Sequence, residues 1–179
     1  MKWRQEMGLL ENAISNITGL DQEAMAEARR RQDELTKPQG SLGMLEEISI
    51  RLAGIFGMAI PPLGKKVVIV MAGDHGVVEE GVSRFPQEVT PQMVLNFLRG
   101  GAAINVLARH AGAEVRVVDI GVATEVSGPG LLARNVRRGT ANMAKGPAMS
   151  REEAVRALET GIQVAWEEIE AGALYLATG

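Results

Sequence analysis

The stretch VVIVMAGDHGVVEEGVSRFPQEVTPQM, residues 67–93, decides the fold of this chain. It opens with an apolar and largely β-branched run, Val67–Met71, and turns at a glycine before Asp74 and His75. An apolar run without polar alternation is typical of a strand that is covered on both faces, as in a parallel sheet between helices. Because ligands of such sheets bind beyond the carboxyl ends of the strands, Asp74 and His75 are candidate functional residues.

The same pattern recurs twice further along the chain. The run Val115–Ile120 ends beside a carboxylate and a glycine, Asp119 and Gly121, and Ala173–Gly179 also ends on glycine. Stretches with helical spacing separate the three runs, and each connection is long enough for a right-handed crossover. The sequence therefore predicts an α/β fold with a parallel sheet of three strands. Because domains seldom end at the tip of a buried strand, we expect the chain to be half of a larger unit.

Residues 1–60 are expected to form a small helical subdomain, and residues 61–179 the α/β part. Asp21 is placed to cap one helix, and Ser41 to cap the next. Pro61-Pro62 marks the nearest sign of a boundary. The second of these helices carries apolar residues at helical spacing on one face: Leu45, Ile48, Leu52 and Ile55.

The connection after the first strand, roughly Ala72 to Thr90, is long, and loops of that length are uncommon unless they are functional. Thr90 is expected to cap the following helix, with proline at its first position. Gly100-Gly101 is expected to mark a kink, a break or a close approach by another segment in that helix, because glycine is unfavourable in a helix interior. Ser150 and Glu153 form a capping box that predicts the start of the last helix.

Composition narrows the functional classes. The chain of 179 residues is 46% hydrophobic, which is typical of one soluble globular unit. Its net charge of −3 and the lack of a basic stripe argue against a nucleic-acid or membrane-surface partner. The absence of cysteine excludes disulfides and thiolate metal sites. Neither a membrane span nor a signal peptide is apparent, so we expect a cytoplasmic protein.

The residues alone leave three roles open for Asp74 and His75: a metal pair, an acid/base pair, or hydrogen-bonding groups that organise the long loop. The other histidine, His110, falls late in a helix, where a surface or capping role is expected. A two-metal hydrolase would need more ligands than these. The sequence contains neither a Walker loop nor a G-x-G-x-x-G after a strand, so a phosphate would be held by helix N-termini and strand ends such as Gly179.

Four stretches taken together resemble one known family, that of nicotinate-nucleotide:dimethylbenzimidazole phosphoribosyltransferase, which makes α-ribazole phosphate for the lower ligand of cobalamin. The resemblance covers essentially the whole chain from about residue 20, in family order. The four stretches are LTKPQGSLGMLE (residues 35–46), VMAGDHGVVEEGVSRFPQEVTPQMV (70–94), GGAAINVLARHAGAEVRVVDIGV (100–122) and RGTANMAKGPAMSREEA (138–154).

This resemblance implies a Rossmann-like, three-layer α/β enzyme, usually a homodimer, with a small helical domain and neither a metal nor another cofactor. Family members transfer the phosphoribosyl group from nicotinate mononucleotide to a ring nitrogen of the benzimidazole, with inversion at the anomeric carbon. Their general base is a glutamate near the C-terminus, expected here beyond residue 179. A glutamate-methionine-glycine segment that helps bind the nucleotide should follow Gly179. The chain alone is therefore expected to contain no catalytic residue and to be inactive.

The resemblance also places two residues, Phe85 and Met93, in the pocket for the base. Some members have a small hydroxyl residue and a glutamine at these positions, whereas both residues here are large and apolar. A flat aromatic base can stack on Phe85 and contact the thioether of Met93. Pro86, Asp74 and His75 are expected beside this pocket, and Gly179 is expected to bind substrate at the end of the last strand.

Two alternatives belong to other functional classes. The first is a metal-dependent phosphohydrolase that uses Asp74 and His75, which binding of zinc or manganese would favour. The second is a base-binding module without catalysis, or a subunit that docks onto a separately encoded half. If the chain were active alone, the catalytic carboxylate would lie within its residues, and Glu79, Glu80, Glu88 and Asp119 would be the candidates.

Overall fold

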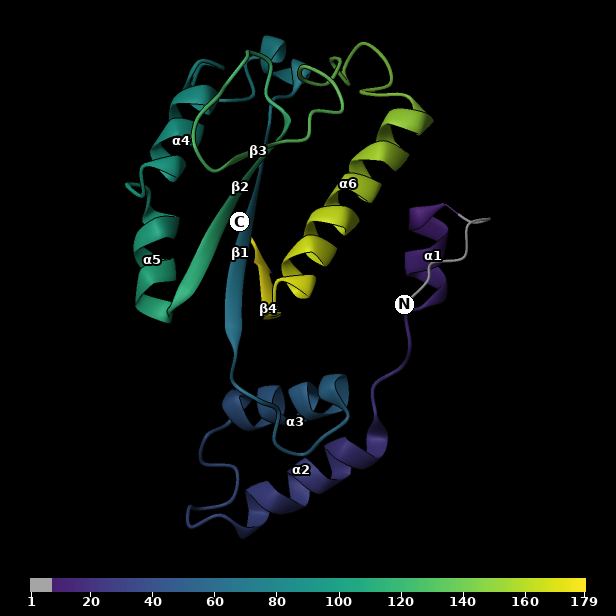
Figure 1. Cartoon of the computed structure of the whole chain (residues 1–179), viewed down its shortest axis with the longest axis vertical. Helices are drawn as coiled ribbons and strands as arrows, with labels where there is room; N and C mark the ends of the chain where they lie inside the picture. The colour runs from purple at the N-terminus through teal and green to yellow at the C-terminus, as the bar shows by residue number, and fades with distance from the viewer. Residues whose placement is uncertain (1–7) are drawn as a thin grey trace. The chain divides into compact units, whose positions relative to one another are not determined.

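The structure, a computed structural model, describes residues 8–179 (Figure 1). By their contacts these residues form two compact units, one of residues 14–63 and one of residues 8–13 with 64–179. Residues 8–13 thus belong to the α/β unit, whereas the sequence placed them with the helices of residues 1–60. Residues 1–7, the first part of the expected helical subdomain, lie outside the described residues.

The α/β unit is built on a parallel sheet of four strands in the order β3-β2-β1-β4. The strands are β1 (Lys65–Gly73), β2 (Ala113–Gly121), β3 (Leu131–Ala133) and β4 (Ala173–Thr178). The predicted parallel α/β fold is confirmed, but the predicted number of strands is wrong. The additional strand, β3, has only three residues and pairs with Val117–Asp119 of β2, so it is too short to show a periodic pattern in the sequence.

Helices cover both faces of this sheet. α4 (Val89–Leu98) and α5 (Ala103–Ala111) lie on one side, and α6 (Arg151–Glu170) lies on the other (Figure 1). A separate core fills each side: Val164 of α6 packs on Val67, while Val94 of α4 packs on Ala72. The backbone amide of Leu10, in α1 (Leu9–Ser15), donates to the Glu159 carboxylate of α6 (3.2 Å). The chain therefore has the three layers expected of a doubly covered sheet.

Glycine and side-chain caps set several helix ends as expected. Ser150 Oγ accepts from the Glu153 amide (3.1 Å), and the Glu153 carboxylate accepts from the Ser150 amide (2.8 Å), which completes the predicted capping box. The break at Gly100-Gly101 is also confirmed, because Gly100 adopts φ +76° between α4 and α5. Thr90 is not a cap: α4 begins one residue earlier, and no side chain caps it.

The helical unit consists of α2 (Gln22–Glu34) and α3 (Met44–Phe56). Asp21 caps α2 as predicted, accepting from the Ala24 amide (2.9 Å). Ser41 does not cap α3, which begins after Gly43 without a side-chain cap. The expected apolar face of α3 is largely exposed as well. The two helices pack instead through a core of Ala28, Ile50 and Ala53, and a side chain on Gly54 would collide with Met25.

None of the helices in residues 8–179 is both long enough and apolar enough to cross a membrane.

Candidate functional site

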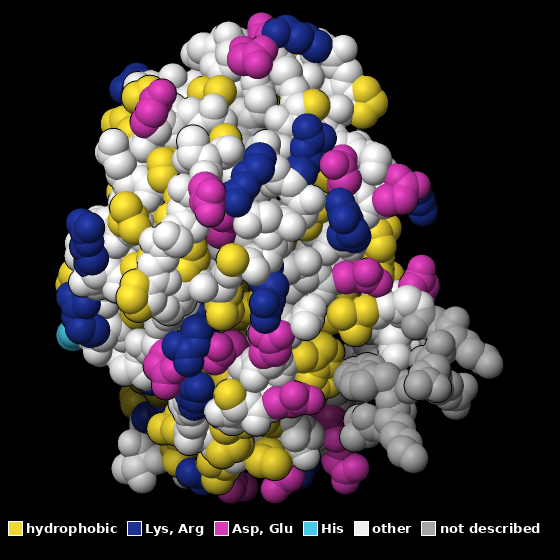
Figure 2. All heavy atoms as spheres, turned by 45° about the horizontal axis from the view of Figure 1, so that its top comes forward, with side chains coloured by type: hydrophobic (Ala, Val, Ile, Leu, Met, Phe, Trp, Pro, Cys, Tyr) yellow, Lys and Arg dark blue, Asp and Glu magenta, His cyan; other side chains and the backbone are white. Residues whose placement is uncertain are grey.

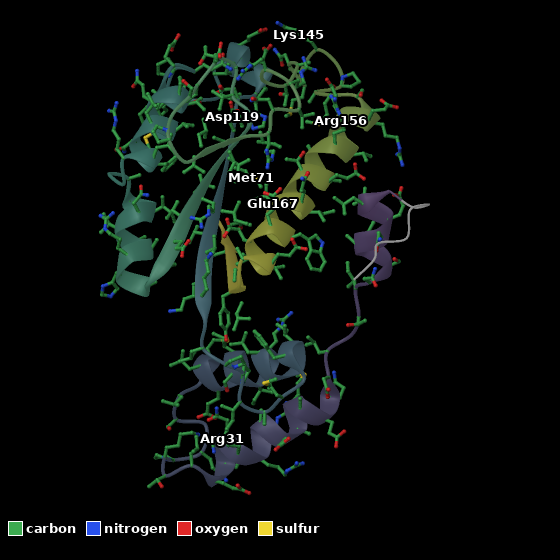
Figure 3. All side chains as sticks on the ribbon, viewed as in Figure 1. Arg31, Met71, Asp119, Lys145, Arg156 and Glu167 are labelled. Carbon is green, nitrogen blue, oxygen red and sulfur yellow. The ribbon has the colours of Figure 1, made fainter. Side chains whose placement is uncertain are left out.

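A cavity of about 480 Å³ opens at the carboxyl end of β1, between the loop that follows the strand and α4. The loop contains a short 3₁₀ helix, η1 (Gly76–Glu80), and then runs over Val82–Gln87 to α4. Most side chains around the cavity are apolar, among them Met71 at the end of β1 (Figure 3). The volume lies in the range of small-molecule pockets, which are typically about 300–1,000 Å³ and predominantly apolar.

Five of the six candidate substrate-binding residues line this cavity: Asp74, His75, Phe85, Pro86 and Met93. Gly179 does not line it. The Gly179 amide donates to the Ile69 carbonyl (3.0 Å), and a side chain there would touch Val68 and Val70 at 3.3 Å, so Gly179 lies along β1. Residues that sequence reasoning missed complete the walls: Val77, Val78 and Val82 from the loop, and Thr90 and Phe97 from α4.

Phe85 offers an open aromatic surface, because 69% of the residue is exposed. Its backbone is fixed by Ser83, whose hydroxyl accepts from the Phe85 amide (3.2 Å) and donates to the Phe85 carbonyl (3.0 Å). Met93 lies on α4 and is 36% exposed. The two side chains therefore present aromatic and thioether surface to a ligand in the cavity.

Asp74 is buried and organises the loops around the site. Its Oδ1 accepts from the Thr90 hydroxyl (2.6 Å), and its Oδ2 accepts from the Ala123 amide (2.8 Å). Its own amide donates to Gly121 (3.0 Å), and its carbonyl accepts from Thr140 (2.9 Å). Both carboxylate oxygens are thus engaged within the protein. Of the three roles open to Asp74, the geometry favours the structural one.

His75 is exposed and lies between two cavities. One is the cavity beside α4, and the other is a smaller cavity of about 120 Å³ on the α6 side, lined in part by Val136, Thr140 and Glu153. The His75 backbone forms an isolated parallel bridge with Thr140. Within residues 8–179 the imidazole has no hydrogen-bond partner, so it is free to contact a ligand. His110 lies in the last turn of α5 and is exposed, as expected.

A segment that showed no pattern in the sequence crosses the ends of β1 and β2. We call residues 134–142 the strap. Its main-chain amides donate to three carbonyls of β2, Arg134 to Asp119 (3.0 Å), Val136 to Ile120 (3.1 Å) and Gly139 to Gly121 (3.0 Å), and Thr140 donates to Asp74 (2.9 Å), just after β1. α6 also holds the strap, because Arg156 donates to the Val136 carbonyl (3.2 Å) and Glu167 pairs with Arg134 (3.3 Å) (Figure 3).

The other carboxylates near the strand ends do not reach the cavity. Asp119 is fully buried, accepts from the amides of Gly121 (3.1 Å) and Val122 (2.8 Å), and pairs with Arg138 (3.3 Å). Glu79 pairs with Lys145 (2.6 Å), and this hydrogen bond holds the pKa of Glu79 below its usual value. None of the four candidate carboxylates of the sequence analysis lines the cavity: Asp119, Glu79, Glu80 and Glu88.

Charges on the outer face follow no single sign. On the part of the α/β unit that faces forward in Figure 2, basic and acidic side chains alternate, and no basic stripe is visible. In residues 8–179 no three histidine, aspartate or glutamate side chains come together as metal ligands. With both oxygens of Asp74 engaged, Asp74 and His75 do not form a ready metal pair.

Comparisons with known proteins agree with the architecture. A family model described as "Phosphoribosyltransferase" matches residues 17–179. The chain is 62% identical to the nicotinate-nucleotide–dimethylbenzimidazole phosphoribosyltransferase of Chloroflexus aggregans and 59% identical to that of Geobacter sulfurreducens. Each match covers 97% of this chain and 49% of the relative. The chain thus spans about half the length of the curated relatives it matches.

A solved structure shows the same fold. The crystal structure of CobT from Thermus thermophilus is 57% identical in sequence and superposes with a TM-score of 0.84, over 88% of this chain and 47% of that one. The family match over residues 17–179, together with this likeness in sequence and fold, shows that the chain belongs to the nicotinate-nucleotide–dimethylbenzimidazole phosphoribosyltransferase family.

Proposed function

We propose that this chain supplies the base pocket for phosphoribosyl transfer from nicotinate mononucleotide to 5,6-dimethylbenzimidazole or a related base, giving α-ribazole 5'-phosphate. The observation that carries the proposal is the apolar cavity at the end of β1, with Phe85 and Met93 on its walls. Relatives that are 56–62% identical and named for this reaction support it.

The chemistry of the cavity suits a flat base with an apolar ring. Burying the methyl-substituted ring against valine, methionine and phenylalanine side chains is favourable, by about 25 cal/mol per Å² of apolar surface removed from water. The Phe85 ring is available for stacking. Since the oxygens of Asp74 are already engaged, we propose that the base is held mainly by shape and apolar contact, with His75 as the polar group at the edge of the cavity.

Transfer of the phosphoribosyl group has three requirements. The base nitrogen must be held close to the anomeric carbon, positive charge on the sugar must be stabilised in the transition state, and a carboxylate must take the azole proton. Asp74 is the only carboxylate that lines the cavity among the described residues, and both of its oxygens already accept hydrogen bonds within the protein. We therefore propose that the general base lies outside this chain, and that the chain alone binds the base without turnover.

The nucleotide is proposed to bind beside the end of β4, near Gly179. A homodimer and a cytoplasmic location also stay predictions. A role as a base-binding subunit that works with a separately encoded half is also a prediction. A partner chain that restores turnover would establish it.

The direct test is to titrate 5,6-dimethylbenzimidazole into the 179-residue chain by calorimetry and compare Phe85→Ala with the parent. We expect the substitution to weaken binding roughly tenfold, because base–aromatic stacking contributes about 1–3 kcal/mol. Leu158→Ala is the matched control, since Leu158 is an exposed apolar residue on α6 that does not line the cavity. Equal affinities for the parent and Phe85→Ala would overturn the assignment of the pocket.

A second assay addresses turnover. The chain is incubated with nicotinate mononucleotide and the base, and α-ribazole 5'-phosphate is followed by chromatography. We expect none above the uncatalysed rate. Product formed by the chain alone would show that the general base is within these 179 residues and would turn attention to Glu79, Glu80, Glu88 and Asp119.

A further inference from the structure

We infer that Asp74 is a positioning residue that fixes the α4 wall of the cavity to the end of β1 through Thr90. The inference goes beyond base binding by Phe85 and Met93, and its effect on affinity rests on the proposed function. Thr90 is the second residue of α4, and its hydroxyl donates to Asp74 Oδ1 at 2.6 Å. Met93 follows three residues later, on the same side of the helix, so a displacement of Thr90 also displaces Met93.

The first turn of α4 has few other attachments. No side chain caps the helix, because Glu88 at the cap position makes no capping hydrogen bond. The fully buried Val94 anchors the middle of the helix in the core beside β1 and β2. The Thr90 hydroxyl is thus the polar link between the start of α4 and β1.

The second oxygen of Asp74 makes this link rigid. Asp74 is only 6% exposed, and Oδ2 accepts from the Ala123 amide in the connection between β2 and β3. The carboxylate therefore joins two segments from different parts of the chain. Hydrogen bonds to an ionised carboxylate are stronger than neutral ones, and a buried charged oxygen that loses its donor is costly. Movement of α4 away from β1 would leave Oδ1 without this donor.

The sharpest variant is Thr90→Val, which keeps the shape of the side chain and replaces the hydroxyl with a methyl group. We expect it to weaken binding of 5,6-dimethylbenzimidazole about tenfold, which corresponds to about 1.4 kcal/mol. Thr90→Ser restores the hydroxyl and should bind within about twofold of the parent, a difference of less than about 0.5 kcal/mol by the same relation. Asp74→Ala removes both acceptor oxygens, the one for the Thr90 hydroxyl and the one for the Ala123 amide, and should weaken binding at least as much as Thr90→Val does.

The matched control is Thr160→Val. Thr160 lies on α6, its hydroxyl donates to the Arg156 carbonyl (2.8 Å), and it does not line the cavity. Melting temperatures are measured for all variants, so that affinity is compared between folded proteins. A residue that served stability alone would lower the melting temperature and leave the affinity of the folded protein unchanged, and that result would overturn the inference.

Amide hydrogen exchange tests the same link without any ligand. Residues 93–98 of α4 have amides bonded within the helix, unlike the first four. Faster exchange of these amides in Thr90→Val, but not in Thr90→Ser or Thr160→Val, would support the positioning role. Unchanged exchange would overturn it. If the parent fails to bind the base, the proposed function fails, while exchange still decides the role of Asp74.

Discussion

Gly76 lies at the closest main-chain approach in the site. A side chain at this position would come within 2.7 Å of the backbone of the strap at Thr140, Ala141 and Asn142. The Gly76 amide also donates to the Thr140 carbonyl (3.1 Å). A backbone neighbour cannot rotate away as a flexible side chain can, so a methyl group here must separate η1 from the strap.

Gly76→Ala should therefore destabilise the protein by about 1–3 kcal/mol, the usual cost of forcing extra atoms into a packed site. Urea denaturation followed by circular dichroism measures the change. Gly146→Ala is the control, because a side chain on Gly146 would meet no atom within 4 Å. Equal stability of Gly76→Ala and Gly146→Ala would show that the strap can shift without cost.

Asp74 and Asp119 show which parts of the site the sequence pattern can predict. Each follows an apolar run and lies close to a glycine, so the sequence presented both as carboxylates at a strand end. The structure brings only Asp74 to the cavity, while Asp119 is fully buried beneath Arg138 and two backbone amides. Burial depends on how the strap crosses the strands, and no local pattern encodes that path.

Helix ends were predictable where their partners are local. Asp21 and Ser150 bond to amides three residues ahead, so each cap can be read from adjacent sequence. Thr90 also looked like a helix cap in the sequence, but its hydroxyl bonds to Asp74, which precedes it by 16 residues. The Thr90 hydroxyl therefore bonds to a residue outside the helix and does not cap the helix end. Likewise, β3 exists because β2 pairs with it, and three residues carry too little pattern to predict it.

The capping box of α6 gives a prediction at this scale. The Ser150 amide lowers the pKa of Glu153, so the carboxylate is ionised at neutral pH and the box is complete there. Ser150→Ala removes the side-chain acceptor for the Glu153 amide and should cost about 1 kcal/mol. Ser150→Asp, which keeps an acceptor, should be close to the parent in chemical denaturation. A loss of the same size in both variants would contradict the cap as the cause.

At the scale of the whole molecule, the outer edge of β4 has no strand paired with it in the described residues. β4 stands at the end of the sheet order, and nothing in residues 8–179 pairs with its outer side. Leu174 and Leu176 on this strand are 43% and 39% exposed. Unpaired edges with apolar side chains are templates for pairing with another chain, whether a second copy or the part of the family fold that this chain does not span.

We expect the 179-residue chain to self-associate through β4. Sedimentation velocity over a range of concentrations should show species larger than a monomer, and Leu176→Lys should shift the distribution toward monomer, because a charge on an edge strand opposes pairing. Leu107→Lys, on the exposed side of α5, is the control and should leave the distribution unchanged. A monomer at high concentration in the parent chain would contradict this prediction.

The strap has a consequence for how this fold can diversify. Its three bonds to β2 and its bond to Asp74 come from main-chain amides, which every residue except proline possesses. These four main-chain bonds do not depend on which side chains the strap carries. Residue identity matters at Gly139, with its φ of +70°, at Gly76 opposite, and at Arg138, which pairs with the buried Asp119. A lineage can thus exchange most side chains of the segment beside its ligand crevice while inheriting the same backbone path.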